Sequence, residues 1–229
     1  MSTEKERIMN AGHDRASAKR MAFVAAARAA FFANGYAGTT MSSVAASVGG
    51  SKSTLWKYFP SKEDLFAAVI DDIVEKYGRA HSMKFSQDED VLVTLRCFLN
   101  ILIATILSEA VISLHRLIVS EAHNFPRLSK LYYERGPMPV KNILANYLES
   151  LMRRGTMNLG DPSLAAQQLI GMVQSGAFQD ALLGLRQPSS ERLKAEIDVA
   201  INSFCLGWMP RNDIDSAVAS TTNAGPKHR

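Results

Sequence analysis

Apolar residues recur at helical spacing along most of the 229-residue chain. Within residues 17–33, the side chains of Val24, Ala27 and Phe31 fall on one face of a helix. Asn34 and Gly35 end this helix, because glycine tolerates the left-handed backbone of a helix stop. No segment shows the alternation of polar and apolar residues that is typical of a strand. The pattern therefore predicts an all-α protein.

Two short helices are predicted between Met41 and Phe59, with a break at Gly49 and Gly50. The hydroxyl of Ser51 can cap the second of them by accepting a backbone hydrogen bond. Two helices of about two turns each, joined by a tight turn, have the dimensions of a helix-turn-helix. The second helix of such a motif enters the major groove of DNA.

The rest of the chain predicts a larger helical body. Residues 88–107 are apolar nearly all round, which indicates a buried helix. Further helices are expected at residues 109–124, 127–154, 161–184 and 189–208, with a disturbance at Gly136, Pro137 and Pro139. A hinge is predicted at residues 81–87. We therefore expect a small domain at residues 15–80, a helical domain at 88–208 and a disordered tail at 209–229.

Charge is distributed unevenly along the chain. The chain has 22 acidic residues and a formal net charge of +4, yet no Asp or Glu lies between Arg15 and Lys62. The basic residues of that block are Arg15, Lys19, Arg20, Arg28, Lys52, Lys57 and Lys62. Phosphate repels carboxylates and attracts cations, so the block suits a polyanion, although charge alone fits a solvated basic face equally well.

The sequence gives little support to other classes of protein, such as membrane proteins, secreted proteins and enzymes. No apolar stretch approaches the roughly 20 residues of a membrane span, and the N-terminus lacks the apolar core of a signal peptide, so we expect a cytoplasmic protein. The two cysteines fit a reducing compartment, and Cys97 is expected to be buried. No metal-ligand spacing, catalytic nucleophile motif or Gly-rich phosphate loop is present, so we expect no cofactor, no metal, no catalytic residue and no enzyme activity.

One helix face carries groups that occur in enzyme sites, namely His115, Arg116, Glu121 and His123. Without an accompanying catalytic motif, these side chains indicate a salt-bridged or half-exposed helix face.

The second short helix has an outward face that can contact DNA. Its ammonium groups suit phosphate or guanine, its hydroxyls suit base edges, and its aromatic rings offer flat apolar surface. Leu55 and Phe59 face inward, four residues apart, and hold the helix on its domain. The outward residues are Lys52, Ser53, Thr54, Trp56, Lys57 and Tyr58.

A longer series of residues resembles the N-terminal signature of the TetR family of repressors over about residues 19–73. The matching positions are Ala26, Ala27, Phe31, Gly35, Tyr36, Thr39, Thr40, Val44, Ala45, Gly49, Ser51, Lys52, Thr54, Leu55, Tyr58, Phe59, Ser61, Lys62, Glu63 and Leu65. The resemblance implies that Thr40, Tyr58 and Lys62 contact phosphates. It also implies that Lys52, Ser53, Thr54 and Trp56 face base edges. With Ser51 and Lys57, these residues form the expected DNA-binding set.

This chain departs from the family pattern at three positions. Ser53 stands where glycine is common and Trp56 where tyrosine is usual, which points to a different operator sequence. Gly50 stands where valine is frequent, which predicts a looser turn.

The second half resembles the ligand domain of the AcrR and AefR-like subgroups. The resemblance is carried by Arg116, Leu117, Ile118, Glu121, Ala122, Phe125, Pro126, Tyr132 and Tyr133. It implies a homodimer that binds a small apolar or amphipathic effector. Candidate ligand contacts are Arg96, Asn100, His115, Met172 and Phe178.

Dimerisation is expected through the last two long helices. Ile197, Ile201, Phe204 and Trp208 keep near-heptad spacing, which can form a seam between subunits, while packing within one chain is the alternative. The helix at residues 62–77 is expected to be the only link between the small domain and the larger one. These observations predict a ligand-responsive repressor that binds a palindromic operator. A regulator or structural DNA-binding protein without an effector remains the alternative.

Overall fold

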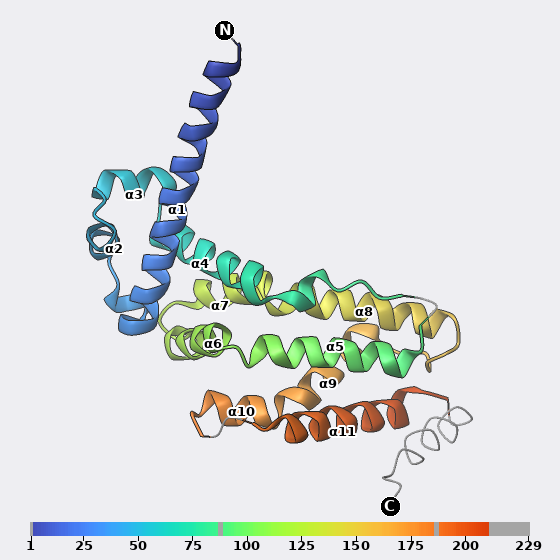
Figure 1. Cartoon of the computed structure of the whole chain (residues 1–229). Coiled ribbons are helices and arrows are strands. Elements are labelled where there is room, and N and C mark those ends of the chain that lie inside the picture. Colours follow the sequence, from blue (N-terminus) through green and yellow to red (C-terminus); the bar gives the residue numbers. More distant parts are fainter. Residues whose placement is uncertain (1, 87–88, 186–187, 211–229) are drawn as a thin grey trace, which may run out of the picture. The chain divides into compact units, whose positions relative to one another are not determined.

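The computed structural model describes the backbone of residues 2–86, 89–185 and 188–210, and side chains from residue 15 onward (Figure 1). Helices make up the regular structure of these residues, which confirms the all-α prediction. In chain order they are α1 (Ser2–Gly38), α2 (Met41–Ser47), α3 (Lys52–Tyr58), α4 (Lys62–Tyr77), the 3₁₀ helix η1 (Arg79–Ser82), α5 (Val91–Ile106), α6 (Glu109–Glu121), α7 (Pro126–Arg135), α8 (Pro137–Arg153), α9 (Pro162–Gln174), α10 (Ala177–Leu182) and α11 (Ser190–Trp208).

Local sequence sets most of these boundaries. Gly35 adopts φ 74° and ψ 171°, which interrupts α1 where the sequence predicts a stop. The hydroxyl of Ser61 accepts a hydrogen bond from the backbone N–H of Asp64 at 3.0 Å and so caps α4. Gly136 separates α7 from α8, and Pro137 begins α8, a position where proline costs no helical hydrogen bond.

Two expectations about helix length are wrong. α1 begins at Ser2 and not near residue 17, so it extends well beyond the family-like segment. The helix expected at residues 161–184 is broken into α9 and α10 at Gly176. The carboxylate of Glu196 accepts hydrogen bonds from the backbone N–H of Ala177 at 3.0 and 3.1 Å, which stabilises the start of α10 from outside the helix.

The chain divides into two compact units. The first contains residues 1–76 together with 113–136, and the second contains 77–112 together with 137–229. The chain therefore passes from one unit to the other at three places, and α4 is not the only connection. The expected hinge at residues 81–87 begins in η1, whose Ala80 is fully buried in the core of the second unit; residue 87 lies outside the described residues.

Aromatic side chains form much of the core of the first unit. Phe66 of α4 meets Phe31 edge to face at 5.3 Å between ring centroids, and meets Tyr36 at 5.5 Å. Phe125, which precedes α7, packs on Tyr36 at 5.0 Å. α7 and the C-terminal part of α6 therefore belong to the same core as α1 and α4.

A buried ion pair adds to this packing between α1 and α4. The carboxylate of Asp72 is 4% exposed and lies 3.2 Å from the guanidinium of Arg28 and 2.6 Å from the ammonium of Lys76. Arg28 therefore serves the fold, although the sequence places it in the basic block.

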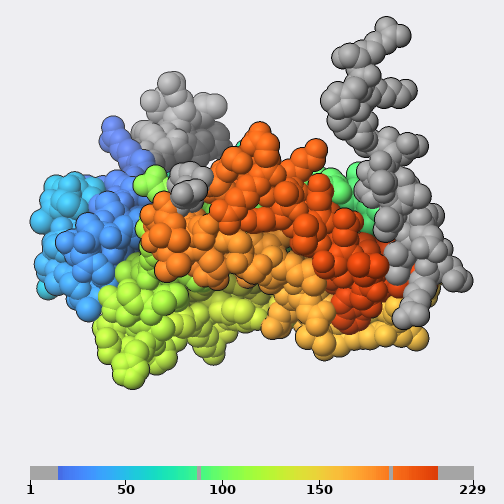
Figure 2. All heavy atoms as spheres, turned by 90° about the horizontal axis from the view of Figure 1, so that it is seen from below, coloured from blue at the N-terminus to red at the C-terminus, as the bar shows by residue number. Residues whose placement is uncertain are grey.

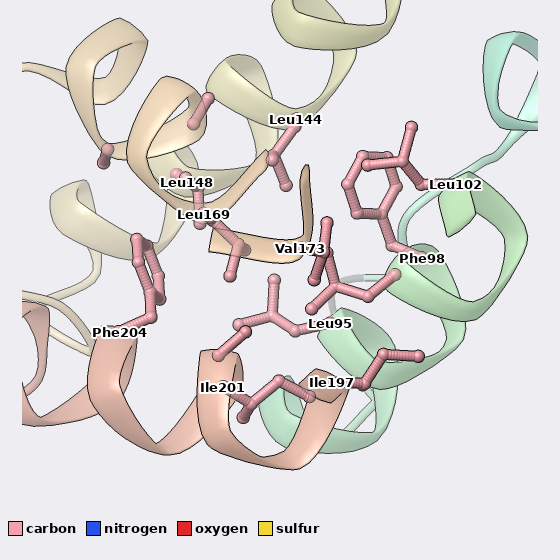
Figure 3. Close-up of a cluster of buried hydrophobic side chains, with 14 of the residues drawn as sticks. Leu95, Phe98, Leu102, Leu144, Leu148, Leu169, Val173, Ile197, Ile201 and Phe204 are labelled. Carbon is pink, nitrogen blue, oxygen red and sulfur yellow. The ribbon is translucent and has the colours of Figure 1, made fainter. Parts of the chain in front are cut away.

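The second unit has an apolar core to which α5, α8, α9 and α11 contribute (Figure 3). Ile197, Ile201 and Phe204 of α11 are each 1% exposed and point into this core beside Leu95 and Leu169. The prediction that they form the seam between subunits is therefore wrong, because the chain itself covers this face of α11. Trp208 is half-buried, and its indole N–H donates to the side-chain oxygen of Gln168 at 2.9 Å.

α5 has two distinct faces, which corrects the expectation that it is buried all round. Val93, Cys97, Asn100 and Ala104 are exposed along one side, while the opposite side packs into the core. The Cys97 thiol is therefore exposed and not buried as expected, whereas Cys205 is buried.

The expected tail begins inside the fold, since Met209 is buried in the core of the second unit. The remainder of that expectation falls on residues 211–229, outside the described residues. Among the described residues, no single helix is long and apolar enough to cross a membrane; the bent pair of α5 and α6 passes that test together, by length and composition only.

Candidate nucleic-acid interface

α2 and α3 form the predicted pair of short helices, joined by a turn at residues 48–51. Thr40 caps α2: its hydroxyl accepts from the backbone N–H of Ser43 at 3.1 Å, and the Ser43 hydroxyl accepts from the N–H of Thr40 at 3.2 Å. Ser51 caps α3 by accepting from the backbone N–H of Thr54 at 3.2 Å. Capping at both starts fixes the direction of these seven-residue helices, which are too short to be stable alone.

α3 presents one face to the core of the first unit and the other to solvent. Leu55 and Phe59 are buried, as predicted, and anchor the helix. Trp56 is 42% exposed. The fully outward set comprises Ser51, Lys52, Ser53, Trp56 and Lys57, while Thr54 and Tyr58 are half-buried. This arrangement offers cations, hydroxyls and an aromatic surface together.

The hydroxyl groups at the start of α3 bond to one another. The Oγ of Ser51 lies 2.9 Å from the Oγ of Ser53 and 2.8 Å from the Oγ1 of Thr54. Hydroxyls held in this way can rotate to donate or accept, which suits phosphate oxygens and base edges alike.

The Lys62 side chain is bound within the protein more closely than expected for a residue that only contacts a phosphate. Its ammonium donates hydrogen bonds to the carbonyl oxygens of Tyr36 at 2.7 Å and Thr39 at 2.9 Å, and lies 4.2 Å from the centre of the Tyr36 ring. Burial lowers the pKa of Lys62 and raises that of Tyr36 to about 12. One of the three ammonium donors remains for a phosphate beyond these two carbonyls.

Some of the other cations of the basic block are exposed, and some contact other parts of the protein. Arg15, Arg20, Lys52 and Lys57 are exposed. The guanidinium of Arg20 also lies over the Phe59 ring at 5.1 Å, and the ammonium of Lys19 donates to the Val48 carbonyl at 3.5 Å. Lys19 and Arg20 of α1 thus contact the segment that contains α2 and α3, to which Lys52 and Lys57 belong.

The turn between α2 and α3 is filled by a neighbouring side chain. A Cβ atom added at Gly50 would lie 2.9 Å from Cζ of Phe23, a ring that is fully buried. The backbone N–H of Gly50 also donates to the Ala45 carbonyl at 3.0 Å. The structure therefore differs from the looser turn expected at Gly50: the Phe23 ring occupies the space of the missing side chain.

The candidate ligand contacts are distributed over both units. His115 belongs to the first unit, where its Nδ1 lies 3.1 Å from the Tyr132 hydroxyl. The other four belong to the second unit. Arg96 forms an ion pair with Asp198, Asn100 is exposed, Met172 is half-buried and Phe178 lies in the core.

Glu121 is a residue whose position sequence reasoning missed. The pattern predicts a half-exposed or salt-bridged side chain, but Glu121 is 8% exposed and its carboxylate accepts from the backbone N–H of Ala37 at 3.1 Å. Arg116 of the same helix and His123 in the turn that follows it are exposed. A contact between residues 84 positions apart has no local signature in the sequence.

Two family models match the chain. Residues 93–207 match the model described as "AefR-like transcriptional repressor, C-terminal domain", and residues 23–69 match "Bacterial regulatory proteins, tetR family". The second match contains α2, α3, the hydroxyls described above for these helices and the cations Lys52, Lys57 and Lys62.

Individual proteins are similar over most of the chain. The solved structure of the "Flavonoid-responsive Regulator FrrA" is 30% identical, with a TM-score of 0.76 over 85% of this chain and 99% of that one. A putative TetR-family transcriptional regulator from Mesorhizobium loti is 29% identical, with a TM-score of 0.73 over 86% and 99%. The nucleoid occlusion factor SlmA of Aliivibrio fischeri is 29% identical over 150 residues, which are 63% of this chain and 73% of that protein.

Proposed function

Because this chain belongs to the TetR family of transcriptional regulators, we propose that it represses transcription as a homodimer on a palindromic operator and is released by a small effector. The observation that carries the proposal is the exposed face of α3, on which Lys52, Ser53, Trp56 and Lys57 lie outward while Leu55 anchors the helix. A protein that reads chromosomal DNA in this way works in the cytoplasm.

Selection of bound fragments from genomic DNA tests the DNA-binding part and yields the operator. Affinity for the operator should fall steeply as salt rises, because the cations displace counterions condensed on the duplex. Lys57→Ala should weaken binding to all sequences to a similar extent, whereas Thr54→Ala should change which bases are preferred. Binding that ignores both sequence and salt would contradict the proposal.

The outward faces of α9 and α11 are our proposed dimer interface. The two helices lie side by side at the surface of the second unit (orange to red in Figure 2). Val199 is 64% exposed and Leu206 63%, and a Cβ at Gly171 or Gly207 would meet no other atom within 4 Å. Exposed apolar side chains among small residues allow helices of two subunits to approach closely, and a two-fold dimer requires a self-complementary surface.

Val199→Glu tests this interface, with Val93→Glu on α5 as a matched control at 61% exposure. The first substitution would bury an unpaired charge between subunits, so we expect a monomer in sedimentation. The second should leave the dimer intact. If Val199→Glu remains dimeric, the subunits meet elsewhere.

The effector proposal rests on the match of residues 93–207 to the AefR-like domain and on the similarity to a flavonoid-responsive regulator. We therefore expect an apolar or amphipathic effector, and flavonoids are the first compounds to test. Calorimetry with and without operator is the measurement. Linkage requires operator DNA to weaken effector binding by the factor by which the effector weakens operator binding.

A second function is favoured by the similarity to a nucleoid occlusion factor. In that case the chain would act as a structural DNA-binding protein that needs no effector. Many dispersed sites in the selected fragments would support this alternative. One or a few sites beside regulated genes would support the repressor.

A further inference from the structure

We propose that Glu121 is a positioning residue for DNA binding: its carboxylate holds the connection between α1 and α2 and so sets where Thr40 and the helix-turn-helix lie on the operator. The inference rests on the DNA binding proposed above. It concerns the first unit alone, to which α1–α4 and residues 113–136 belong.

The carboxylate lies against the backbone of this connection. Its Oε1 accepts the hydrogen bond from Ala37, and a Cβ atom at Gly35 would lie 2.9 Å from the same oxygen. Gly35 has the positive φ that favours glycine, so the chain bends at the point where the carboxylate approaches. The bend and the hydrogen bond together fix the exit of the chain from α1.

Two further side chains hold the same connection. The Lys62 ammonium donates to the carbonyls of Tyr36 and Thr39, and the Thr39 hydroxyl donates to the carbonyl of Gly35 at 2.8 Å. These bonds satisfy backbone groups that no helix could satisfy there. Thr40 follows directly and caps α2, so the position of the connection is passed to the DNA-facing helices.

Tyr36 and Thr39 of this connection are buried, whereas Ala37, Gly38 and Thr40 are exposed, so apolar packing fixes only part of it. Hydrogen bonds to the charged groups of Glu121 and Lys62 hold it as well, and such bonds are stronger than bonds between neutral groups.

The position of the Glu121 carboxylate is unfavourable for a negative charge, and packing alone does not explain it. Glu121 is the last residue of α6, where the negative end of the helix dipole disfavours an anion. Burial disfavours it further, because a desolvated charge needs hydrogen bonds or an opposite charge. Lys62 supplies part of the compensation: burial lowers the pKa of Lys62, and the charges of Glu121 and Glu63 act in the opposite direction. An apolar residue would avoid these costs but could not bind the Ala37 N–H.

Three variants of the full-length protein test the role, measured on the selected operator and on random-sequence DNA at one salt concentration. Glu121→Ala removes the acceptor, Glu121→Asp keeps the charge but withdraws it by one methylene, and Glu121→Gln keeps the reach without the charge. Glu134→Ala, an exposed acid on α7, makes the same change in net charge as Glu121→Ala and is the control.

We expect Glu121→Ala and Glu121→Asp to weaken operator binding about tenfold, the equivalent of one lost charged hydrogen bond. Binding to random DNA should change much less, because a displaced recognition helix still meets phosphates. Glu121→Gln should stay within about threefold of the wild type, since its amide oxygen can accept from Ala37. The melting temperature of each variant separates positioning from unfolding.

Two results would overturn the inference. One is an operator affinity of Glu121→Ala equal to that of Glu134→Ala. The other is a weak Glu121→Gln beside an unchanged Glu121→Asp, which would show that charge matters and reach does not. If Glu121→Ala does not fold, the operator affinities of Glu121→Asp and Glu121→Gln still test the inference. A wild-type protein that selects no operator would refute the proposed function itself, a distinguishable outcome.

Discussion

Gly50 and Phe23 test how tightly the turn before α3 is packed. Gly50→Ala would place a Cβ atom 2.9 Å from Cζ and 3.1 Å from Cε1 of Phe23, closer than carbon atoms approach without displacement. The ring is fully buried and cannot swing into solvent. Overpacking of a core costs about 1–3 kcal/mol, so we expect Gly50→Ala to lower the free energy of unfolding by about 2 kcal/mol. Valine, frequent at this position in the family, should cost more.

Gly49 provides the control for backbone strain. It has φ 62°, and a Cβ atom there would meet nothing within 4 Å. Gly49→Ala should therefore cost about 1–2 kcal/mol from the left-handed backbone alone. Phe23→Leu removes the two ring atoms that Gly50→Ala would meet, so it should rescue Gly50→Ala and leave the cost of Gly49→Ala unchanged.

Urea unfolding followed by circular dichroism, at one protein concentration, measures these free energies. The double-mutant cycle of Gly50→Ala with Phe23→Leu should show a coupling of about 1 kcal/mol or more. Additivity within about 0.5 kcal/mol would refute the steric reasoning. Operator affinity, measured in parallel, should follow the same order, because the turn sets the angle of α3.

In the native protein one thiol per chain should react with a thiol reagent, since Cys97 is exposed while burial raises the pKa of Cys205 to about 11; two reactive thiols before unfolding would contradict this. Burial lowers the pKa of His115, so the unfolded chain binds more protons as the pH falls through about 6.5, the ordinary histidine value, and stability should decline below that pH. His115→Gln should flatten this decline in melting temperature between about pH 7 and 5, and the exposed His123→Gln should not. Asp72→Asn should lower the free energy of unfolding by about 2 kcal/mol. This is less than the cost of breaking a fully buried ion pair, because the two cationic partners of Asp72 are partly exposed. A change below about 0.5 kcal/mol in urea unfolding would contradict the prediction.

The sequence by itself determined the helical class, most helix boundaries and the helix-turn-helix. Ser51 at the start of α3, Gly35 at the bend of α1 and Gly136 between α7 and α8 act through backbone groups within a few residues, so their effect can be predicted from neighbours in the chain. The outward face of α3 was equally predictable, because Leu55 and Phe59 mark its inner face by their spacing.

Only the tertiary structure decided which segments pack on each face of a helix and which faces stay exposed to solvent. The spacing of Ile197, Ile201 and Phe204 predicts an apolar stripe, but a stripe does not tell whether the same chain or a second subunit packs on it. Cys97 is exposed for a related reason: residues 88–107 are so apolar that the sequence gives no indication of which side of α5 faces solvent.

Contacts between segments far apart in the chain could not be predicted from the sequence, for a further reason. Lys62 lies on the carbonyls of Tyr36 and Thr39, and Glu121 lies on the N–H of Ala37, because the folded chain brings these groups together across 23 to 84 residues. Backbone hydrogen-bonding groups are the same at every residue, so a side chain that binds them leaves no complementary residue type to find. Local spacing therefore located the DNA-facing helices, and the fold alone determined what holds them in place.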